Sequence, residues 1–301
     1  FWYDELHRKT RNVDYGTKGG IEINPFLRPS GTPPASSSAN VLVMKHSYTL
    51  ESEPLEATDT MGIVSRSEYD EPGRLVRRVD NYSGDGTPGP GSDQDRTVEY
   101  SYNALGKVVL KTEKASYYDQ AAGGYLDRVT EYIYGVTRGA SPPDSLIASN
   151  DLPRLVKYPD PDSATPGQPS ADVNDQLALA YNAQGELVWR KDANGTERIF
   201  AYDLRGRLTQ DLVGTFGPGL DRTMAEVART YDALDRPELI TVIGEQGQIR
   251  NEVKYEYGRY STVSTLWQDP DTIVDGTSPK VQFAYSYPTD GTTGTRRTAT
   301  T

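Results

Sequence analysis

One short pattern recurs along this 301-residue chain: Tyr, then Asp or Asn, two variable residues and Gly. Four complete copies are Tyr69-Asp70-Glu71-Pro72-Gly73, Tyr102-Asn103-Ala104-Leu105-Gly106, Tyr181-Asn182-Ala183-Gln184-Gly185 and Tyr202-Asp203-Leu204-Arg205-Gly206. Two variants begin at Tyr231-Asp232 and Tyr3-Asp4, with Asp235 and His7 in place of Gly. A local pattern that repeats while its spacers vary in length predicts a chain of similar structural units.

The residues of the pattern have the chemistry of a turn. A type I turn favours Asp or Asn at its first position and Gly at its fourth. With a left-handed fourth residue, such a turn joins two strands as a bulged hairpin. Asp and His tolerate the left-handed region better than most residues, so Asp235 and His7 fit the pattern. Pro72, at the third position, leaves the type of the first turn open.

A second kind of turn alternates with these. Asp192-Ala193-Asn194-Gly195 follows the same Asp-x-x-Gly rule between the third and fourth copies. Residues 186–191 and 196–202 flank it, and each segment is long enough for a strand of about 20 Å. Alternation places Leu187 with Trp189, and Phe200 with Tyr202, on shared faces. The fold class predicted is therefore all-β, a long antiparallel meander of hairpins.

Helical periodicity is weak throughout, and its best candidate, residues 223–229, reads equally well as a strand. We expect one continuous repeat region over residues 1–301, as a fragment of a larger protein. Segments rich in Pro, Gly and Ser predict loop insertions, which in repeat proteins lie along one rim. They cover residues 28–40, 83–95, 159–175, 214–221 and 269–280.

The composition fits a sheet with exposed faces. Only 35% of residues are hydrophobic, and Tyr outnumbers Phe by 21 to 5, which suits surfaces that are apolar at the ring and wet at the hydroxyl. The net charge of −11 makes nucleic acid an unfavourable partner, because phosphate binding needs clustered Lys and Arg. No apolar run approaches the ~20 residues of a membrane span, so we expect no membrane insertion.

Residues for catalysis or metal binding are scarce. The chain has two histidines, His7 and His46, and no cysteine, which leaves no ordinary zinc site and no recognisable triad. Asp269, Asp271 and Asp275 could offer oxygens to calcium, but their spacing favours a solvated loop. We assign no catalytic, cofactor or metal-binding residue and expect no enzyme. Trp189 and Trp267 could contact sugars, although cross-strand pairing in the sheet is the preferred interpretation.

The repeated motifs resemble the YD repeats of the rearrangement-hot-spot (Rhs) family, which occur in bacterial polymorphic toxin shells, the C component of Tc toxins and animal teneurins. The match is closest over residues 192–208 and extends over residues 69–287. The resemblance implies an antiparallel sheet that curls into a spiral or hollow shell around another polypeptide. The family's toxin shells end in a self-cleaving aspartyl segment, which residues 269–276 only echo.

The resemblance implies a function as well. The chain would be a non-catalytic wall segment of a secreted or cell-surface shell that encloses or presents another polypeptide. Its partners would be the rest of the parent chain or the enclosed polypeptide. The alternative is an extracellular adhesive or filament-forming protein that self-assembles through its sheet edges or binds glycans.

Overall fold

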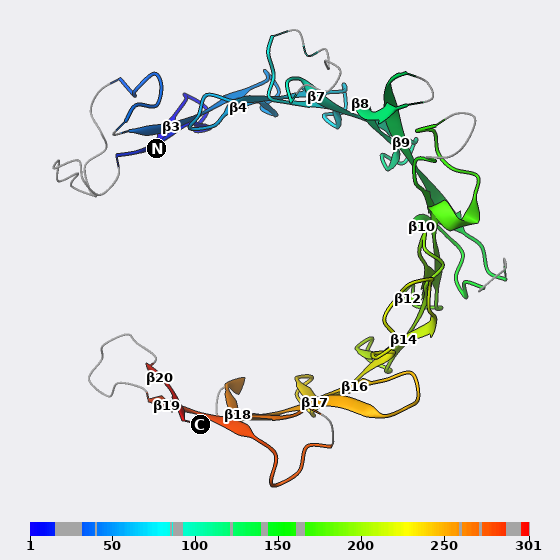
Figure 1. Ribbon diagram of the computed structural model, residues 1–301. Helices are drawn as coiled ribbons and strands as arrows, with labels where there is room; N and C mark the ends of the chain where they lie inside the picture. Colours follow the sequence, from blue (N-terminus) through cyan, green and yellow to red (C-terminus); the bar gives the residue numbers. More distant parts are fainter. Residues whose placement is uncertain are drawn as a thin grey trace. The chain divides into compact units, whose positions relative to one another are not determined.

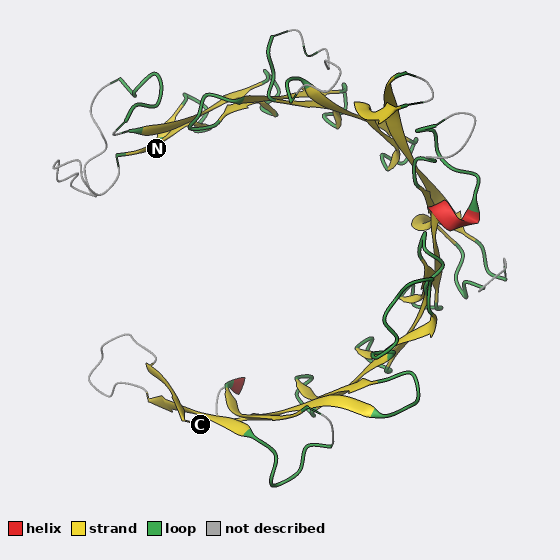
Figure 2. Cartoon of the chain, in the orientation of Figure 1, coloured by secondary structure: helices red, strands yellow, loops and turns green. Residues whose placement is uncertain are grey.

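A computed structural model describes residues 1–15, 32–39, 41–84, 86, 93–120, 123–139, 144–160, 166–258, 261–270, 273–286 and 296–300. Within these residues, twenty strands form one sheet in which neighbouring segments pair antiparallel as a meander (Figure 1). Strands and loops make up nearly everything drawn in Figure 2. The all-β meander predicted from the turn motifs is confirmed.

The chain divides into two compact units. Unit 1 comprises residues 1–133 and 156–172, and unit 2 comprises residues 134–155 and 173–301. Strands β9 (Gly124–Val136) and β10 (Ser149–Lys157) contribute residues to both units. The other strands of unit 1 are β1 (Trp2–Tyr3), β2 (Lys9–Asp14), β3 (Leu42–Tyr48), β4 (Pro54–Thr58), β5 (Val64–Tyr69), β6 (Leu75–Asp80), β7 (Arg96–Tyr102) and β8 (Val108–Asp119).

Unit 2 is built as an antiparallel meander too. Its remaining strands are β11 (Gln176–Tyr181), β12 (Leu187–Lys191), β13 (Glu197–Tyr202), β14 (Leu208–Thr215), β15 (Glu226–Tyr231), β16 (Pro237–Ile243), β17 (Ile249–Tyr257), β18 (Val263–Asp269), β19 (Lys280–Ser286) and β20 (Arg296–Thr300). The segment with ambiguous periodicity, residues 223–229, leads into strand β15 and is not helical.

Most predicted insertions connect strands, with small corrections at their ends. Gly214 and Thr215 belong to β14, while Asp269 and Lys280 end β18 and begin β19. Residues 173–175, expected as loop, form a short 3₁₀ helix. Parts of the predicted loops lie outside the described residues, namely 28–31, 40, 85, 87–92, 161–165 and 271–272.

In unit 1, burial occurs where insertions fold onto the sheet. Val43 is 1% exposed beside Ser37, whose hydroxyl accepts a hydrogen bond from the Val43 N–H at 2.9 Å. Val79 is fully buried opposite Thr97, whose hydroxyl bonds the carbonyl of Gly86. Directly paired residues in β3 to β7 place Val43, Val79 and Thr97 on one face. The small core of this unit therefore lies between one sheet face and its loops.

Unit 2 repeats this arrangement around a polar group. Glu252 is 4% exposed and accepts hydrogen bonds from the Thr241 hydroxyl (2.7 Å) and the Val274 N–H (2.8 Å). Val274 belongs to the insertion between β18 and β19, which thus covers neighbouring strands of the sheet. Because both carboxylate oxygens have donors, this buried acid has the partners that burial requires.

Candidate functional site

The tyrosine-led turns share one backbone geometry. In the turns that begin at Asp70, Asn103, Asn182 and Asp203, the fourth N–H donates to the first carbonyl at 2.9–3.1 Å. The N–H of the first residue donates to the carbonyl of the residue after the turn at 2.9–3.0 Å. The fourth residues are left-handed, with φ of +80° for Gly73, +75° for Gly106, +84° for Gly185 and +78° for Gly206.

The side chain of the first turn residue reinforces this backbone. Oδ1 of Asp203 accepts hydrogen bonds from the N–H groups of Arg205 (2.9 Å) and Arg207 (3.1 Å). Asn103 and Asn182 accept the corresponding pair. Asp70 accepts the Arg74 N–H at 2.8 Å, while Pro72 has no N–H to offer. The turn with Pro72 nevertheless has the same backbone hydrogen bonds as the others.

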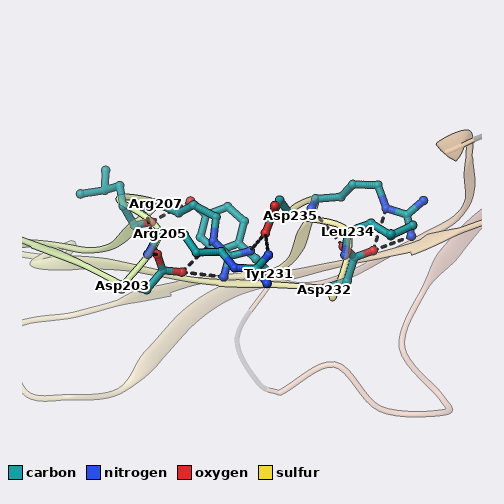
Figure 3. A network of polar contacts seen from close by, with 9 residues as sticks. Asp203, Arg205, Arg207, Tyr231, Asp232, Leu234 and Asp235 are labelled. Atoms are coloured by element: carbon teal, nitrogen blue, oxygen red, sulfur yellow. Dashed lines mark hydrogen bonds and ion pairs between the residues drawn. The ribbon is translucent and has the colours of Figure 1, made fainter.

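Both variant turns adopt the left-handed conformation without glycine. Asp235 has φ +65° and donates its N–H to the Asp232 carbonyl, and His7 has φ +61° and does the same to Asp4. Asp235 also accepts charged hydrogen bonds from Arg205 and Arg207 of the preceding turn, the latter at 2.6 Å. Figure 3 shows these two arginines reaching Asp235. These ion pairs offset part of the cost of a left-handed non-glycine residue.

Two further turns of this kind were missed from the sequence. Tyr48 leads a turn from Thr49 to Ser52, and Ser52 has φ +78°. Tyr257 leads another turn, in which the Gly258 N–H donates to the Thr262 carbonyl and Ser261 has φ +59°. In these copies Thr or Gly replaces Asp, and Ser replaces the final Gly, so neither copy matches the sequence motif. The tyrosine itself was the remaining signal.

A β-bulge accompanies every motif tyrosine from Tyr48 onward. Each tyrosine is paired with the residue six positions later, and the strand register shifts immediately before it. The pairs are Tyr48–Pro54, Tyr69–Leu75, Tyr102–Val108, Tyr181–Leu187, Tyr202–Leu208, Tyr231–Pro237 and Tyr257–Val263. A bulge strengthens local twist and re-aims a side chain.

The tyrosine hydroxyls tie consecutive turns together. In six copies the hydroxyl donates to the carbonyl that lies two residues after the left-handed residue of the preceding turn, at 2.6–2.9 Å. The pairs are Tyr48–Lys9, Tyr69–Pro54, Tyr102–Leu75, Tyr202–Leu187, Tyr231–Leu208 and Tyr257–Pro237. Tyr181 donates to the carbonyl of Pro153 instead. A hydrogen bond of this kind contributes about 0.5–1.5 kcal/mol.

Where the turn begins with Asp, an arginine adds a second tie. The Nε atoms of Arg8, Arg74, Arg207 and Arg236 donate to Asp4, Asp70, Asp203 and Asp232 at 2.7 Å. The same guanidinium groups lie over the ring of the next motif tyrosine. The centroid distances are 4.8 Å for Arg8–Tyr48, 4.6 Å for Arg74–Tyr102, 4.6 Å for Arg207–Tyr231 and 4.1 Å for Arg236–Tyr257.

These contacts form what we call the tyrosine ladder: the motif tyrosines, the carbonyls they bond and the arginines over their rings. Copies that begin with Asn have Lys107 or Glu186 at the arginine position, and Asn182 donates to Glu186 at 2.6 Å. The presence of Asp in a copy therefore coincides with arginine four residues later. Sequence reasoning missed the arginine because its aromatic partner belongs to the next copy.

The ion pairs shift the pKa values of the groups that form them. Hydrogen bonds from Arg74, Arg207 and Arg236 hold the pKa values of Asp70, Asp203 and Asp232 below their usual value. For Asp4, partial burial raises the pKa, but hydrogen bonds from Arg8 outweigh it. Burial raises the pKa values of the Tyr102, Tyr202 and Tyr257 hydroxyls. At neutral pH the acids are charged and the tyrosines keep the protons that they donate.

Each unit has two different rims. The tyrosine-led turns occupy one, which we call the motif rim, because alternate connections of an antiparallel meander lie at the same edge. The opposite edge, the insertion rim, carries the predicted insertions and the tight turn from Asp192 to Gly195, where Gly195 has φ +81°. Similar tight turns, at residues 59–62 and 244–247, lie there too.

The two candidate tryptophans, Trp189 and Trp267, occupy one sheet face of unit 2. Trp189 is paired with Ile199, and Trp267 with Lys254 and Lys280. The Lys280 ammonium lies 4.2 Å from a ring centroid of Trp267. A cation therefore occupies a ring face that a sugar would need.

The other candidate groups lie apart. His7 is a turn residue, whereas His46 lies on β3 beside an open hollow of about 350 Å³, where burial lowers its pKa. Among the described residues no group of three or more acidic, His or Cys side chains is arranged to hold a metal ion. Asp271 lies outside the described residues.

Comparisons with known proteins address the repeat directly. The RHS Repeat family model matches residues 181–217, the segment from Tyr181 through β14. The chain carries an RHS repeat. The resemblance to the Rhs/YD-repeat family is thereby confirmed. No curated protein matches the chain.

Solved structures of Tc toxin assemblies are among those that this chain matches. One is the crystal structure of TcdB2-TccC3-Cdc42, with 15% identity, a TM-score of 0.38, and coverage of 83% of this chain and 13% of that chain. Another is the Photorhabdus luminescens Tc holotoxin pore carrying a TccC3 mutation, with 14% identity, a TM-score of 0.30, and coverage of 94% and 16%. This chain spans a small part of either. None of its described helices is long and apolar enough to cross a membrane.

Proposed function

We propose that this chain is a non-catalytic wall segment of a secreted Rhs/YD-repeat shell, which encloses or presents another polypeptide. The observation that carries the proposal is the tyrosine ladder. Its side chains make hydrogen bonds and cation–ring contacts between consecutive motif copies. The motif residues therefore hold neighbouring hairpins of the sheet together. On this proposal residues 1–301 are one continuous repeat region, and the motif Tyr, Asp or Asn, and Gly residues are architectural.

The faces of unit 1 support a role as a wall. Insertions cover one face around Val43 and Val79, while the opposite face carries His46, Ala57 and Ser65 beside an open hollow. One face of the sheet is covered by insertions and the other is open. Such a sheet fits a wall between two environments better than it fits the packed interior of a domain. Enclosure by the parent protein would place another polypeptide against such a wall.

Protection from protease tests enclosure. The intact parent protein would be digested with a large, non-specific protease, alongside a sample opened with denaturant. We expect one polypeptide to survive in the intact sample and to be degraded after opening. Equal degradation in both samples would contradict enclosure, and the control is the same polypeptide expressed without the repeat region.

An extracellular adhesive or filament-forming protein is the alternative. Strand edges can recruit further strands, so filament formation predicts polymers whose size grows with protein concentration. Light scattering of the purified chain at rising concentration distinguishes the alternatives. A constant monomer mass favours the wall segment, and concentration-dependent growth favours the filament. The Lys280 contact on Trp267 weighs against sugar stacking on that ring.

A further inference from the structure

Exposed leucines mark the motif rim of unit 1. Leu6, Leu50 and Leu105 lie at the tips of three tyrosine-led turns, with exposed fractions of 64%, 95% and 63%. Pro72 occupies the tip of the turn between the last two. Large apolar side chains that are mostly exposed at three of the four turns give an unpartnered apolar line, and an exposed apolar patch can mark an interaction surface.

The sheet sets the spacing of this line. Consecutive motif turns are separated by two strands, which corresponds to about 9.5 Å across an antiparallel sheet. Seven residues of an α-helix rise about 10.5 Å. A helix lying along the rim could therefore present one apolar side chain per heptad to each successive tip.

The negative charge on the same tips favours a helix with basic side chains. Glu5, Glu51 and Glu71 are exposed and adjoin Leu6, Leu50 and Pro72 in their turns. These three carboxylates form no ion pair with any described residue, whereas arginine neutralises the turn aspartates Asp4 and Asp70. The corresponding tips of unit 2 carry no acid in the sequence, and their pairs are Ala183-Gln184, Leu204-Arg205, Ala233-Leu234 and Arg259-Tyr260.

We propose that the motif rim of unit 1 binds a basic amphipathic helix of another polypeptide. The leucine tips contact its apolar stripe, and the glutamates pair with Lys or Arg on its flanks. Charge complementarity and the matching period favour this occupant over a second copy of this chain, whose motif rim would bring like charges together. The proposal does not depend on enclosure, because it requires only that the rim be accessible.

The probe is a fluorescently labelled synthetic helix of about three heptads, with Leu on one stripe and Lys on its flanks. Anisotropy titration against the full chain measures the dissociation constant at low and high salt. We expect saturable binding that weakens with salt, because exposed ion pairs are screened. Replacing Leu6, Leu50 and Leu105 together by Ser should weaken binding by about tenfold or more.

The glutamate variant E5Q/E51Q/E71Q should bind more weakly and lose most of the salt dependence. Leu204→Ser and Leu234→Ser, which alter the same kind of tip in unit 2, are the matched controls and should leave binding unchanged. Circular dichroism verifies that each variant keeps its strands.

Three results would overturn the proposal: no binding up to about 1 mM probe, equal binding by a probe with Glu in place of Lys, or equal binding by the rim variants. Dimerisation abolished by the leucine variant would assign the rim to a second copy instead.

Discussion

Arg207 and Tyr231 join two consecutive turns of the repeat. The guanidinium carbon of Arg207 lies 4.6 Å from the Tyr231 ring centroid, and the Tyr231 hydroxyl donates to the carbonyl of Leu208 at 2.8 Å. Figure 3 shows Arg207 between Asp203 of its own turn and Tyr231 of the next. One side chain thus supports a turn locally and connects it to its neighbour.

Removing a ladder hydroxyl should lower stability measurably. Tyr231→Phe leaves the Leu208 carbonyl without its donor, and we expect the free energy of unfolding to fall by about 0.5–1.5 kcal/mol. Urea unfolding followed by circular dichroism measures the change. Tyr118→Phe is the control, because the Tyr118 hydroxyl has no hydrogen-bond partner among the described residues and should be dispensable. Equal stability of the two variants would remove the ladder hydrogen bond from the account.

Replacing the left-handed Gly206 by alanine should lower the stability of the fold. Gly206→Ala forces an L side chain to φ +78° and brings its Cβ to 2.6 Å from Glu186 Oε1, so we expect a loss of about 1–2 kcal/mol. Gly276→Ala is the matched control, because a Cβ there meets open space without a left-handed backbone. Thermal unfolding of both variants compares the two costs, and a tolerated Gly206→Ala would contradict the turn assignment.

Most turns of the motif rim could be predicted from the sequence, because each turn depends on residues that are adjacent in the chain. Asp203 and Gly206 favour a turn through hydrogen bonds and backbone geometry within the turn itself. Tyr48 and Tyr257 were missed because their turns lack Asp and Gly, although the bulge and the hydroxyl contact survive. The contact between Arg207 and the Tyr231 ring could not be predicted from the sequence. Between the two partners lie 23 residues, and only strand pairing brings them together. The same is true of the insertion that covers Glu252.

The left-handed backbone at Asp235 should cost stability for any residue that is not glycine. Asp235→Ala keeps a left-handed non-glycine residue and removes the acceptor of Arg205 and Arg207, whereas Asp235→Gly removes the acceptor but relieves the backbone. We expect the Ala variant to be less stable than the Gly variant by about 1–2 kcal/mol. Chemical unfolding of both proteins checks the order, and a more stable Ala variant would be inconsistent with the left-handed position.

Lowering the pH should reduce the stability that the ion pairs of the ladder contribute. The pKa values of Asp203 and Asp232 are lowered in the folded chain, so unfolding allows proton uptake at a higher pH. Their stabilisation is present above the unfolded pKa, about 3.9, and is lost as pH falls through the folded pKa. Asp203→Asn should therefore flatten the fall in urea midpoint below about pH 5.

Glu71→Gln is the control for this acid series, because Glu71 is exposed and has no ion pair with any described residue. It should leave the pH profile of the urea midpoint as it is. An unchanged profile for Asp203→Asn would mean that its ion pair with Arg207 does not contribute to stability.

The most direct measurement of the central claim is a high-resolution structure of the intact parent protein. The account predicts that residues 181–213 pair antiparallel with their tyrosine-led turns along one rim, and that the ribbon forms part of a wall with a second polypeptide on one side. Parallel pairing in that segment, or a sheet covered on both faces by other layers of the same domain, would contradict it.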